Sequence, residues 1–555
     1  MSVTKQAALI AAAGTLVLSS LGMTMGARFS PAATTTGAPL VGLTMYGSPN
    51  YTRNFNPFIP NNLSSATDWI FEPLYIVNPL TGRQTPWLAT SYRWTNSDKT
   101  LTFTLRKGVK WSNGTPFTAA DVVFTFDMLK KNPGMDTNGI WQSLSSVVAN
   151  GSNSVSFHFK TVNVPDYFYI AQTMIVPKAQ WSKVANPQKF TDPNPIGTGP
   201  FELSSFRPSE VVLRKNPRYW QASKVRVPQL KFPALTTNTL TDLMLSEGKL
   251  DFATIFTPNI QKTFVAINPR TNHYWFAHSA AVSLYMNLTE YPFNHVAFRQ
   301  AMAYAINKTN IWKRGEYGYE TPSNQGILPP SQQGTWVPKA LATKYAYPYS
   351  PKKAAAALAS MGLKKNAHGQ IINPKTHKQL TVTIQVPTGW TDWVQDCQII
   401  SSELGALGIK VNVYTPSVST NFSDLNLGHF QMALDGPGIY ASPWFDYNQI
   451  LNSAESAPIG QFAPTNVERY HNPQVDAWLN AYVKTTSVAQ QRTLMHKLEQ
   501  VMFTQVPVVG LVSGANWYEY TTTHYTGWPN PKNPYSLGVD YPGNLLIATH
   551  LQPVR

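Results

Sequence analysis

The residues of this chain best suited to hold a ligand are aromatic and polar side chains that follow predicted strands. Trp390 lies in the loop between a predicted strand and the next helix, and Asp435 ends another predicted strand. Asn516 and Trp517 follow a third, buried one. In open α/β sheets, ligands bind beyond the carboxyl ends of the strands. The candidate contacts, all expected at strand ends or in the loops after them, are Tyr46, Trp390, Asp435, Tyr440, Trp444, Asn516 and Trp517.

These residue types bind by stacking and hydrogen bonding rather than by covalent chemistry. Trp and Tyr rings offer flat apolar faces, while Asp and Asn supply hydrogen-bonding groups that orient a ligand. The alternative role of each ring is packing in the hydrophobic core, and that of Asp435 is a salt bridge or a turn cap. Trp393 lies on the apolar face of its predicted helix, so we expect it in the core.

Motifs for catalysis are absent from the sequence. It contains no G-x-S-x-G, no H-E-x-x-H and no P-loop, and its 11 histidines are not placed at metal-ligand spacing within one helix. We therefore predict no enzyme activity, no cofactor and no metal site. A glycan-processing enzyme is the alternative, since carboxylates distant in sequence, such as Glu290, Asp435 and Asp446, can form an acid–base pair.

The composition indicates a large globular protein with few charges. A chain of 555 residues with 43% hydrophobic content predicts two or three domains. Only 13% of the residues are charged, against about 25% in an average domain. The net charge of +16 reflects scarce carboxylates, and because the basic residues are scattered we expect no nucleic-acid partner. A surface poor in carboxylates changes its charge little as pH falls, which suggests an acidic exterior.

The N-terminal 39 residues are typical of an export segment and linker. Lys5 precedes an apolar stretch that begins at Ala7, and small residues and a Ser/Thr/Ala/Pro/Gly-rich stretch follow. We expect a secretory signal, with an uncleaved anchor as the alternative, and an extracytoplasmic protein. There is no cysteine near residues 20–30 for lipid attachment, and the single Cys397 is expected to be buried.

Periodic apolar residues predict the elements that must position the candidate contacts. Residues 380–386 and 409–413 alternate as strands around a helix over 391–407, which predicts a βαβ unit with parallel strands. Two further helices are predicted over 296–308 and 351–361.

A distinctive strand–turn–helix block spans residues 101–126. Alternating apolar residues predict a strand, Asn113-Gly114 predicts a tight turn, and Thr118 with Asp121 predicts the N-cap of a helix. This block resembles the signature segment of the extracellular solute-binding proteins of family 5, which are receptors of ABC importers for peptides, nickel or oligosaccharides. Further landmarks in family order are PIGTGPF at 195–201, LRKNPRYW at 213–220, Asn287, Pro292-Phe293 with 299–301, and 349–351.

The resemblance covers residues 41–555 and implies a fold and a partner. The implied fold is α/β and two-lobed, periplasmic-binding-protein-like (type II, cluster C), with an extra inserted subdomain. Ligand would lie between the lobes, and the closed form would deliver it to a membrane permease. The implied parts are 40–63 with 196–278 and 514–555 as lobe I, 64–195 as the inserted subdomain, and 279–513 as lobe II.

The segment that corresponds to the peptide-binding motif of the family departs from it. Peptide-binding members hold the ligand's ammonium with an aspartate, and here Ser442 or Pro443 stands at that position unless the loop shifts to bring in Asp446. The GWP segment at 527–529 with NPY at 533–535 resembles the tail of oligosaccharide-binding members. We therefore expect an oligosaccharide ligand, with an oligopeptide as the alternative.

Overall fold

The computed structural model describes residues 37–43, 50–59, 62–235, 237–438, 440, 442–485 and 487–554. Tyr46 and residues 1–36 of the predicted export segment lie outside these ranges. The described part combines helices with three larger sheets and two small ones, so the predicted α/β class is confirmed.

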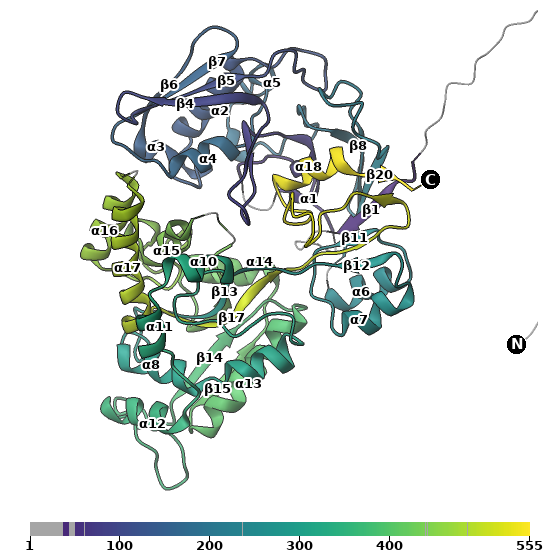
Figure 1. Cartoon of the computed structure of the whole chain (residues 1–555). Helices are drawn as coiled ribbons and strands as arrows, with labels where there is room; N and C mark the ends of the chain where they lie inside the picture. Colours follow the sequence, from purple (N-terminus) through teal and green to yellow (C-terminus); the bar gives the residue numbers. More distant parts are fainter. Residues whose placement is uncertain are drawn as a thin grey trace, which may run out of the picture. The chain divides into compact units, whose positions relative to one another are not determined.

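A mixed five-stranded sheet has the strand order β15-β14-β16-β13-β17. Four of its strands, β13, β14, β15 and β17, are labelled in Figure 1. Its strands are β13 (Ala277–Met286), β14 (Thr381–Gln385), β15 (Lys410–Tyr414), β16 (Met432–Asp435) and β17 (Val508–Asn516). Strands β14 and β15 pair in parallel and are joined by helix α13 (Thr391–Ala406). The predicted βαβ unit is therefore confirmed.

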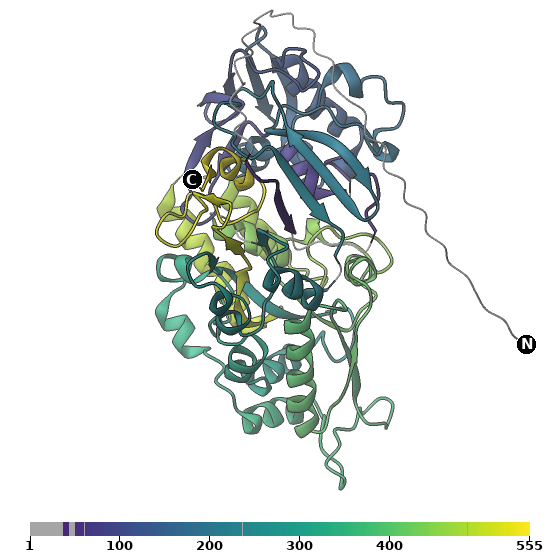
Figure 2. The same cartoon turned by 90° about the vertical axis from the view of Figure 1, so that its right-hand side faces the viewer.

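A second mixed sheet has seven strands in the order β12-β18-β11-β1-β10-β9-β8. Strand β1 pairs in parallel with β10 and β11, and Figure 2 shows this purple strand beside the teal strands of the sheet. The seven strands are β1 (Leu40–Leu43), β8 (Phe201–Arg207), β9 (Glu210–Lys215), β10 (Gln229–Pro233), β11 (Phe252–Ala253), β12 (Asn272–Tyr274) and β18 (Glu519–Thr521).

The block that carries the family signature belongs to an antiparallel sheet with the order β4-β5-β7-β6. Its strands are β4 (Ala89–Thr95), β5 (Thr100–Leu105), β6 (Leu144–Ala149) and β7 (Ser154–Phe159), and helix α2 (Ala119–Lys131) follows β5. The predicted cap is confirmed, because the Thr118 N–H donates to Asp121 Oδ2 at 2.9 Å. The predicted turn contains Gly114 at φ +91°, a conformation that favours glycine.

The remaining elements are two small sheets and the other helices. Two small sheets pair β2 (Tyr75–Val77) with β3 (Gln84–Pro86), and β19 (Tyr525–Thr526) with β20 (Gln552–Pro553). The other α-helices are α1 (Ser64–Ile70), α3 (Ile140–Ser143), α4 (Asp166–Gln172), α5 (Lys178–Trp181), α6 (Asn238–Ser246), α7 (Ile260–Thr263), α8 (Val296–Ala305), α9 (Lys308–Asn310), α10 (Pro330–Trp336), α11 (Lys339–Lys344), α12 (Pro351–Ser360), α14 (Val418–Leu427), α15 (Pro443–Leu451), α16 (Pro473–Val483), α17 (Val488–Gln505) and α18 (Gly543–His550).

The helix predicted over 296–308 ends earlier than expected. Helix α8 stops at Ala305, because Asn307 begins a new helix: its side chain accepts hydrogen bonds from the N–H groups of Thr309 and Asn310. The helix predicted over 351–361 is confirmed as α12, with Ser350 as its N-cap.

Two adjacent segments connect the five-stranded and seven-stranded sheets. The chain leaves the seven-stranded sheet after Tyr274 and enters the other at Ala277. It returns between Asn516 and Glu519. Because Ala277 and Asn516 are paired in the β13–β17 ladder, the two connections lie side by side where they meet the five-stranded sheet. The domain bounds that the family resemblance implies stay a prediction.

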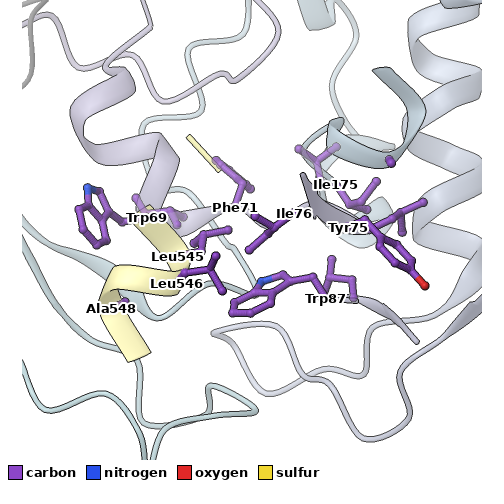
Figure 3. Close-up of a cluster of buried hydrophobic side chains, with 14 of the residues drawn as sticks. Trp69, Phe71, Tyr75, Ile76, Trp87, Ile175, Leu545, Leu546 and Ala548 are labelled. Atoms are coloured by element: carbon purple, nitrogen blue, oxygen red, sulfur yellow. The ribbon is translucent and has the colours of Figure 1, made fainter. Parts of the chain in front are cut away.

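The hydrophobic core is divided among several clusters. Cys397 is fully buried in the cluster beneath the five-stranded sheet, as predicted. In the cluster of the other sheets, Figure 3 shows Leu545 and Leu546 of α18 beside Phe71 and Ile76. This packing ties the C-terminal helix to segments near residues 69–87 and fixes the loop that precedes α18.

Candidate ligand-binding site

A cavity of about 500 Å³ lies among residues that belong to or flank the five-stranded and seven-stranded sheets. We call it the cleft. Its walls combine the connecting segments, the carboxyl ends of strands β14 and β16, and the loop before α18. The lining residues are Ser64, Asp68, Asn238, 254–256, 279–280, Val282, Glu320, Trp390, Asp392, Trp393, Phe422, 435–438, 514–517 and 537–540.

Four of the seven residues predicted to contact ligand line the cleft. They are Trp390, Asp435, Asn516 and Trp517. Tyr440 lines a second cavity instead, and Tyr46 lies outside the described residues. These positions come together because Trp390 and Asp435 follow neighbouring strands of one sheet, whereas Asn516 and Trp517 stand where the chain leaves it.

Trp444 does not line either cavity and is only 6% exposed. It lies in the first turn of α15, where its ring stacks on Tyr482 of α16 with centroids 6.4 Å apart. The prediction that Trp444 lies in the loop after the strand is wrong, because α15 already begins at Pro443. Helix packing then directs the indole into the core.

The indole of Trp517 is half-buried and is held by other rings. Its centroid lies 4.8 Å from that of Phe276 and 5.2 Å from that of Phe256, with the ring planes at 82° and 76°. Edge-to-face pairs of this kind are favourable for aromatic quadrupoles. The ring is therefore fixed before any ligand arrives, which reduces the entropy lost on binding.

The ring of Trp390, which follows β14 of the five-stranded sheet, is also held by a neighbouring ring. Trp390 is the residue before α13, and its ring meets that of Trp393 at 76° with centroids 5.0 Å apart. Trp393 packs against the core, as expected, and also lines the cleft. This second role was not predicted, although a tryptophan three residues after Trp390 on a helix is placed to support it.

Asp435 ends β16 opposite Ser283 of β13. Enclosure by the protein raises the pKa of its carboxyl to about 6, and the Gly436 N–H that donates to Oδ1 at 2.9 Å offsets part of this rise. Below this pH the carboxyl is neutral and both donates and accepts hydrogen bonds.

All the ionisable side chains in the described lining of the cleft are carboxylic acids. The carboxyls belong to Asp68, Glu320, Asp392, Asp435 and Asp540, and no Lys, Arg or His of the described residues takes part in the lining. Burial raises the pKa of Asp392 to about 7 and that of Glu320 well above its usual range. In weak acid the cleft therefore carries little charge.

Two more carboxyls lie behind this wall. Glu316 and Asp396 are fully buried, and their carboxyl groups form a side-chain hydrogen bond with each other. Burial raises the pKa of both well above the usual range, and their mutual proximity adds to this effect for Glu316. Two facing carboxyls form a hydrogen bond only when one of them holds a proton, because two carboxylates both accept.

No group of three or more His, Cys, Asp or Glu side chains among the described residues is arranged to hold a metal ion. Within the same ranges, no helix is both long and apolar enough to cross a bilayer.

The family profile described as "Bacterial extracellular solute-binding proteins, family 5 Middle" matches residues 83–458. The chain belongs to this family. Its members are the solute-binding receptors of ABC importers and not enzymes, so this chain is a receptor of that class.

Individual members differ in what they bind. The chain is 25% identical to the glutathione-binding protein GsiB of Salmonella typhi over 443 residues, which are 77% of this chain and 80% of the relative. A mannohexaose-bound oligopeptide ABC transporter periplasmic binding protein of Thermotoga maritima is 27% identical, with a TM-score of 0.85 over 93% of this chain and 98% of that one. The nonapeptide complex of AppA from Bacillus subtilis, at 18% identity and a TM-score of 0.78, covers 94% and 99% and shares the two-lobed fold.

Proposed function

We propose that this receptor captures an uncharged oligosaccharide in the cleft and delivers it to the permease of an ABC importer. The ligand would stack on Trp390 and Trp517, while Asp435 and Asn516 would hydrogen-bond to its hydroxyls. Sugars present apolar C–H faces as well as hydroxyls, so they match a site that combines aromatic rings with polar groups. Ligand would favour the closed form to the extent that it binds that form more tightly.

The observation that carries this proposal is the absence of a basic side chain from the described lining of the cleft. A short peptide and glutathione both bear carboxylates, and a carboxylate that is removed from water needs a cationic or hydrogen-bonding partner. The cleft offers carboxyls instead, which would repel such an anion whenever they are ionised. A neutral sugar carries no such cost.

The alternative is a peptide ligand, as bound by some relatives. The ammonium group of a peptide would need a carboxylate partner in the site. Asp446, which would have to replace the missing aspartate, is fully buried within α15 and lines neither cavity. Ser442 is the N-cap of α15, with its Oγ accepting from the Trp444 N–H at 3.4 Å. In this alternative, one of the five cleft carboxyls would meet the ammonium; we propose Asp435, at the end of β16, as the position at which the two ligand classes can be told apart.

A thermal-shift screen at pH 5 and pH 7 tests the choice of ligand. Neutral gluco- and manno-oligosaccharides of two to six units are compared with di- to pentapeptides and glutathione. A ligand at 100 times its Kd stabilises the folded state by about 2.7 kcal/mol. The proposal predicts a rise in Tm with at least one oligosaccharide; a rise with peptides alone would reverse it.

We further propose that residues 1–39 direct the protein out of the cytoplasm without lipid attachment. Supporting this are the apolar stretch after Lys5 and the lack of a cysteine near residues 20–30. Expression of the full gene followed by N-terminal sequencing of the exported protein identifies any cleavage point.

We also propose the lobe bounds that the family resemblance implies. They are 40–63, 196–278 and 514–555 for lobe I, and 279–513 for lobe II.

A further inference from the structure

A second cavity adjoins the cleft. We call it the side cavity; its volume is about 450 Å³, and it shares Gly438, Leu537 and Asp540 with the cleft. Three parts of the chain that are distant in sequence form its walls: α4 with β2, the residues Gly438, Tyr440 and Phe445, and the loop and first turns of α18. A ligand pocket of this kind is typically 300–1,000 Å³ in volume, so the side cavity is large enough to hold part of a ligand.

The walls of the side cavity are aromatic and uncharged except for one carboxyl. The rings belong to Phe168, Tyr169, Tyr440, Phe445, Tyr535 and Tyr541. Amide side chains of Asn78, Asn138 and Gln172 lie among them, and the one Asp, Glu, Lys, Arg or His of the described lining is Asp540. Like the cleft, the side cavity combines ring faces with polar side chains, but it holds fewer carboxyls.

The rings of the side cavity are held rigidly. Phe445 is buried and forms its centre: Tyr440 stacks on it at 5.3 Å, and Tyr169 meets it at 5.2 Å with the ring planes at 82°. The Tyr541 hydroxyl donates to the Gln172 carbonyl oxygen at 3.3 Å. Tyr169, Tyr440 and Tyr541 are only half-buried, so each keeps part of its surface accessible.

Part of the side cavity's wall belongs to the hydrophobic core. Ile76 and Leu546 line the side cavity and belong to the hydrophobic cluster of Figure 3. Because close-packed interiors resist rearrangement, this part of the wall is rigid.

Glycine stands at the junction of the two cavities. A Cβ at Gly438 would have no neighbour nearer than the ring of Tyr440 at 3.6 Å, so packing does not require a glycine there. Gly438, which has no side chain, lines both cavities.

We propose that the side cavity is a second subsite for the same ligand. An oligosaccharide held by Trp390 and Trp517 would continue past Gly438 and place its further sugar units against Tyr169 and Tyr440. This inference rests on the proposed function and adds to it a preference for chain length. The receptor would bind longer neutral chains more tightly than a disaccharide, which fills the cleft alone.

Calorimetric titration with neutral oligosaccharides of two to six units tests this directly. We expect affinity to rise by at least tenfold between the disaccharide and the longest chains. In Tyr169→Ala this gain falls to threefold or less, while binding of the disaccharide stays within twofold of the unmodified protein. Tyr414→Ala is the matched control, since Tyr414 is 47% exposed and lines neither cavity.

A second variant obstructs the side cavity rather than removing a wall. Asn138 is exposed at the rim, so Asn138→Trp adds bulk there without disturbing the core. We expect it to abolish the gain with chain length, whereas Gln188→Trp, at an exposed position away from both cavities, keeps it.

The outcomes separate the two proposals. If the disaccharide binds but longer chains gain nothing, or if both variants keep the full gain, the second subsite is wrong and the cleft assignment stands. If no sugar of any length binds, the proposed function fails and this inference fails with it. A gain with length that both variants remove supports the subsite.

Discussion

The indole of Trp517 meets the ring of Phe276 nearly at right angles, at 82°, with centroids 4.8 Å apart. Phe276 immediately precedes β13 and Trp517 immediately follows β17, so this pair joins the two connections between the sheets. The same indole lines the cleft. A ligand that stacks on Trp517 therefore contacts the point about which the two lobes would have to move.

Removal of the cleft tryptophans should weaken sugar binding without unfolding the protein. Both rings are half-buried, so Trp517→Ala and Trp390→Ala each lose a stacking surface and retain most of the core. We expect each to lose about 1–2 kcal/mol of binding free energy, roughly five- to thirtyfold in Kd. Titration calorimetry and the circular dichroism spectrum measure the two effects. Normal binding by both variants would show that the cleft is not the binding site.

Asp435→Asn distinguishes a sugar from an ammonium ligand. Asparagine keeps the size and hydrogen-bonding capacity of a neutral carboxyl but cannot balance a positive charge. At pH 5, below the pKa of about 6, sugar affinity should change by no more than about threefold. A loss of a hundredfold or more, together with peptide binding by the unmodified protein, would favour the peptide receptor.

The buried carboxyls predict a protein that is more stable in acid than at neutral pH. A carboxyl whose pKa is raised by folding holds more protons in the folded state than in the unfolded chain. The free energy of unfolding therefore falls as pH rises between the two pKa values. For Asp392 this interval runs from about 4 in the unfolded chain to about 7 in the folded one. We expect Tm to decrease from pH 5 to pH 8; an increase over this range would contradict the assignment.

Glu316→Gln tests the same cluster at one position. Glutamine imitates the protonated acid and donates a hydrogen bond to Asp396, so the variant should lose less Tm between pH 5 and pH 8, by several degrees. Glu290→Gln is the control, because Glu290 is exposed. Equal pH profiles for the two variants would mean that Glu316 does not contribute.

The family landmark at 195–201 makes a prediction about stability. A Cβ at Gly197 would collide with the carbonyl oxygen of Ile70, because this loop passes directly over the end of α1. Gly197→Ala should cost about 1–3 kcal/mol of unfolding free energy. Gly334→Ala in α10, where a Cβ has open space, should be neutral or slightly stabilising. Equal Tm values for the two variants in thermal denaturation would show that the loop moves aside to make room for the Cβ.

Local patterns in the sequence predict the parts of the fold whose signals are local. The Thr118–Asp121 cap and the βαβ unit from Thr381 to Tyr414 follow from residues that are neighbours in the chain. Asp435 and Trp390 reach the cleft because the ends of neighbouring strands meet at one edge of a sheet. Helix α8 ended early because Asn307 offered a competing cap.

The rest depends on contacts that periodicity does not encode. Trp444 is a core residue because α16 presents Tyr482 to it. The side cavity brings together Tyr169, Tyr440 and Tyr541, which are separated by up to hundreds of residues. The carboxyl cluster was equally hidden, since Glu316 follows the helical turn Ile311–Gly315 whereas Asp396 lies in α13. In each case the packing of whole elements decides which side chains meet.

Sugar capture in the cleft is tested most directly by titration of the purified protein at pH 5 with a neutral hexasaccharide, with chromatography of the sugar after the titration. We predict saturable binding at one ligand per protein, recovery of the sugar intact, and a marked loss of affinity in Trp517→Ala. Release of shorter sugars, or binding of a pentapeptide with none of any neutral oligosaccharide, would contradict this prediction.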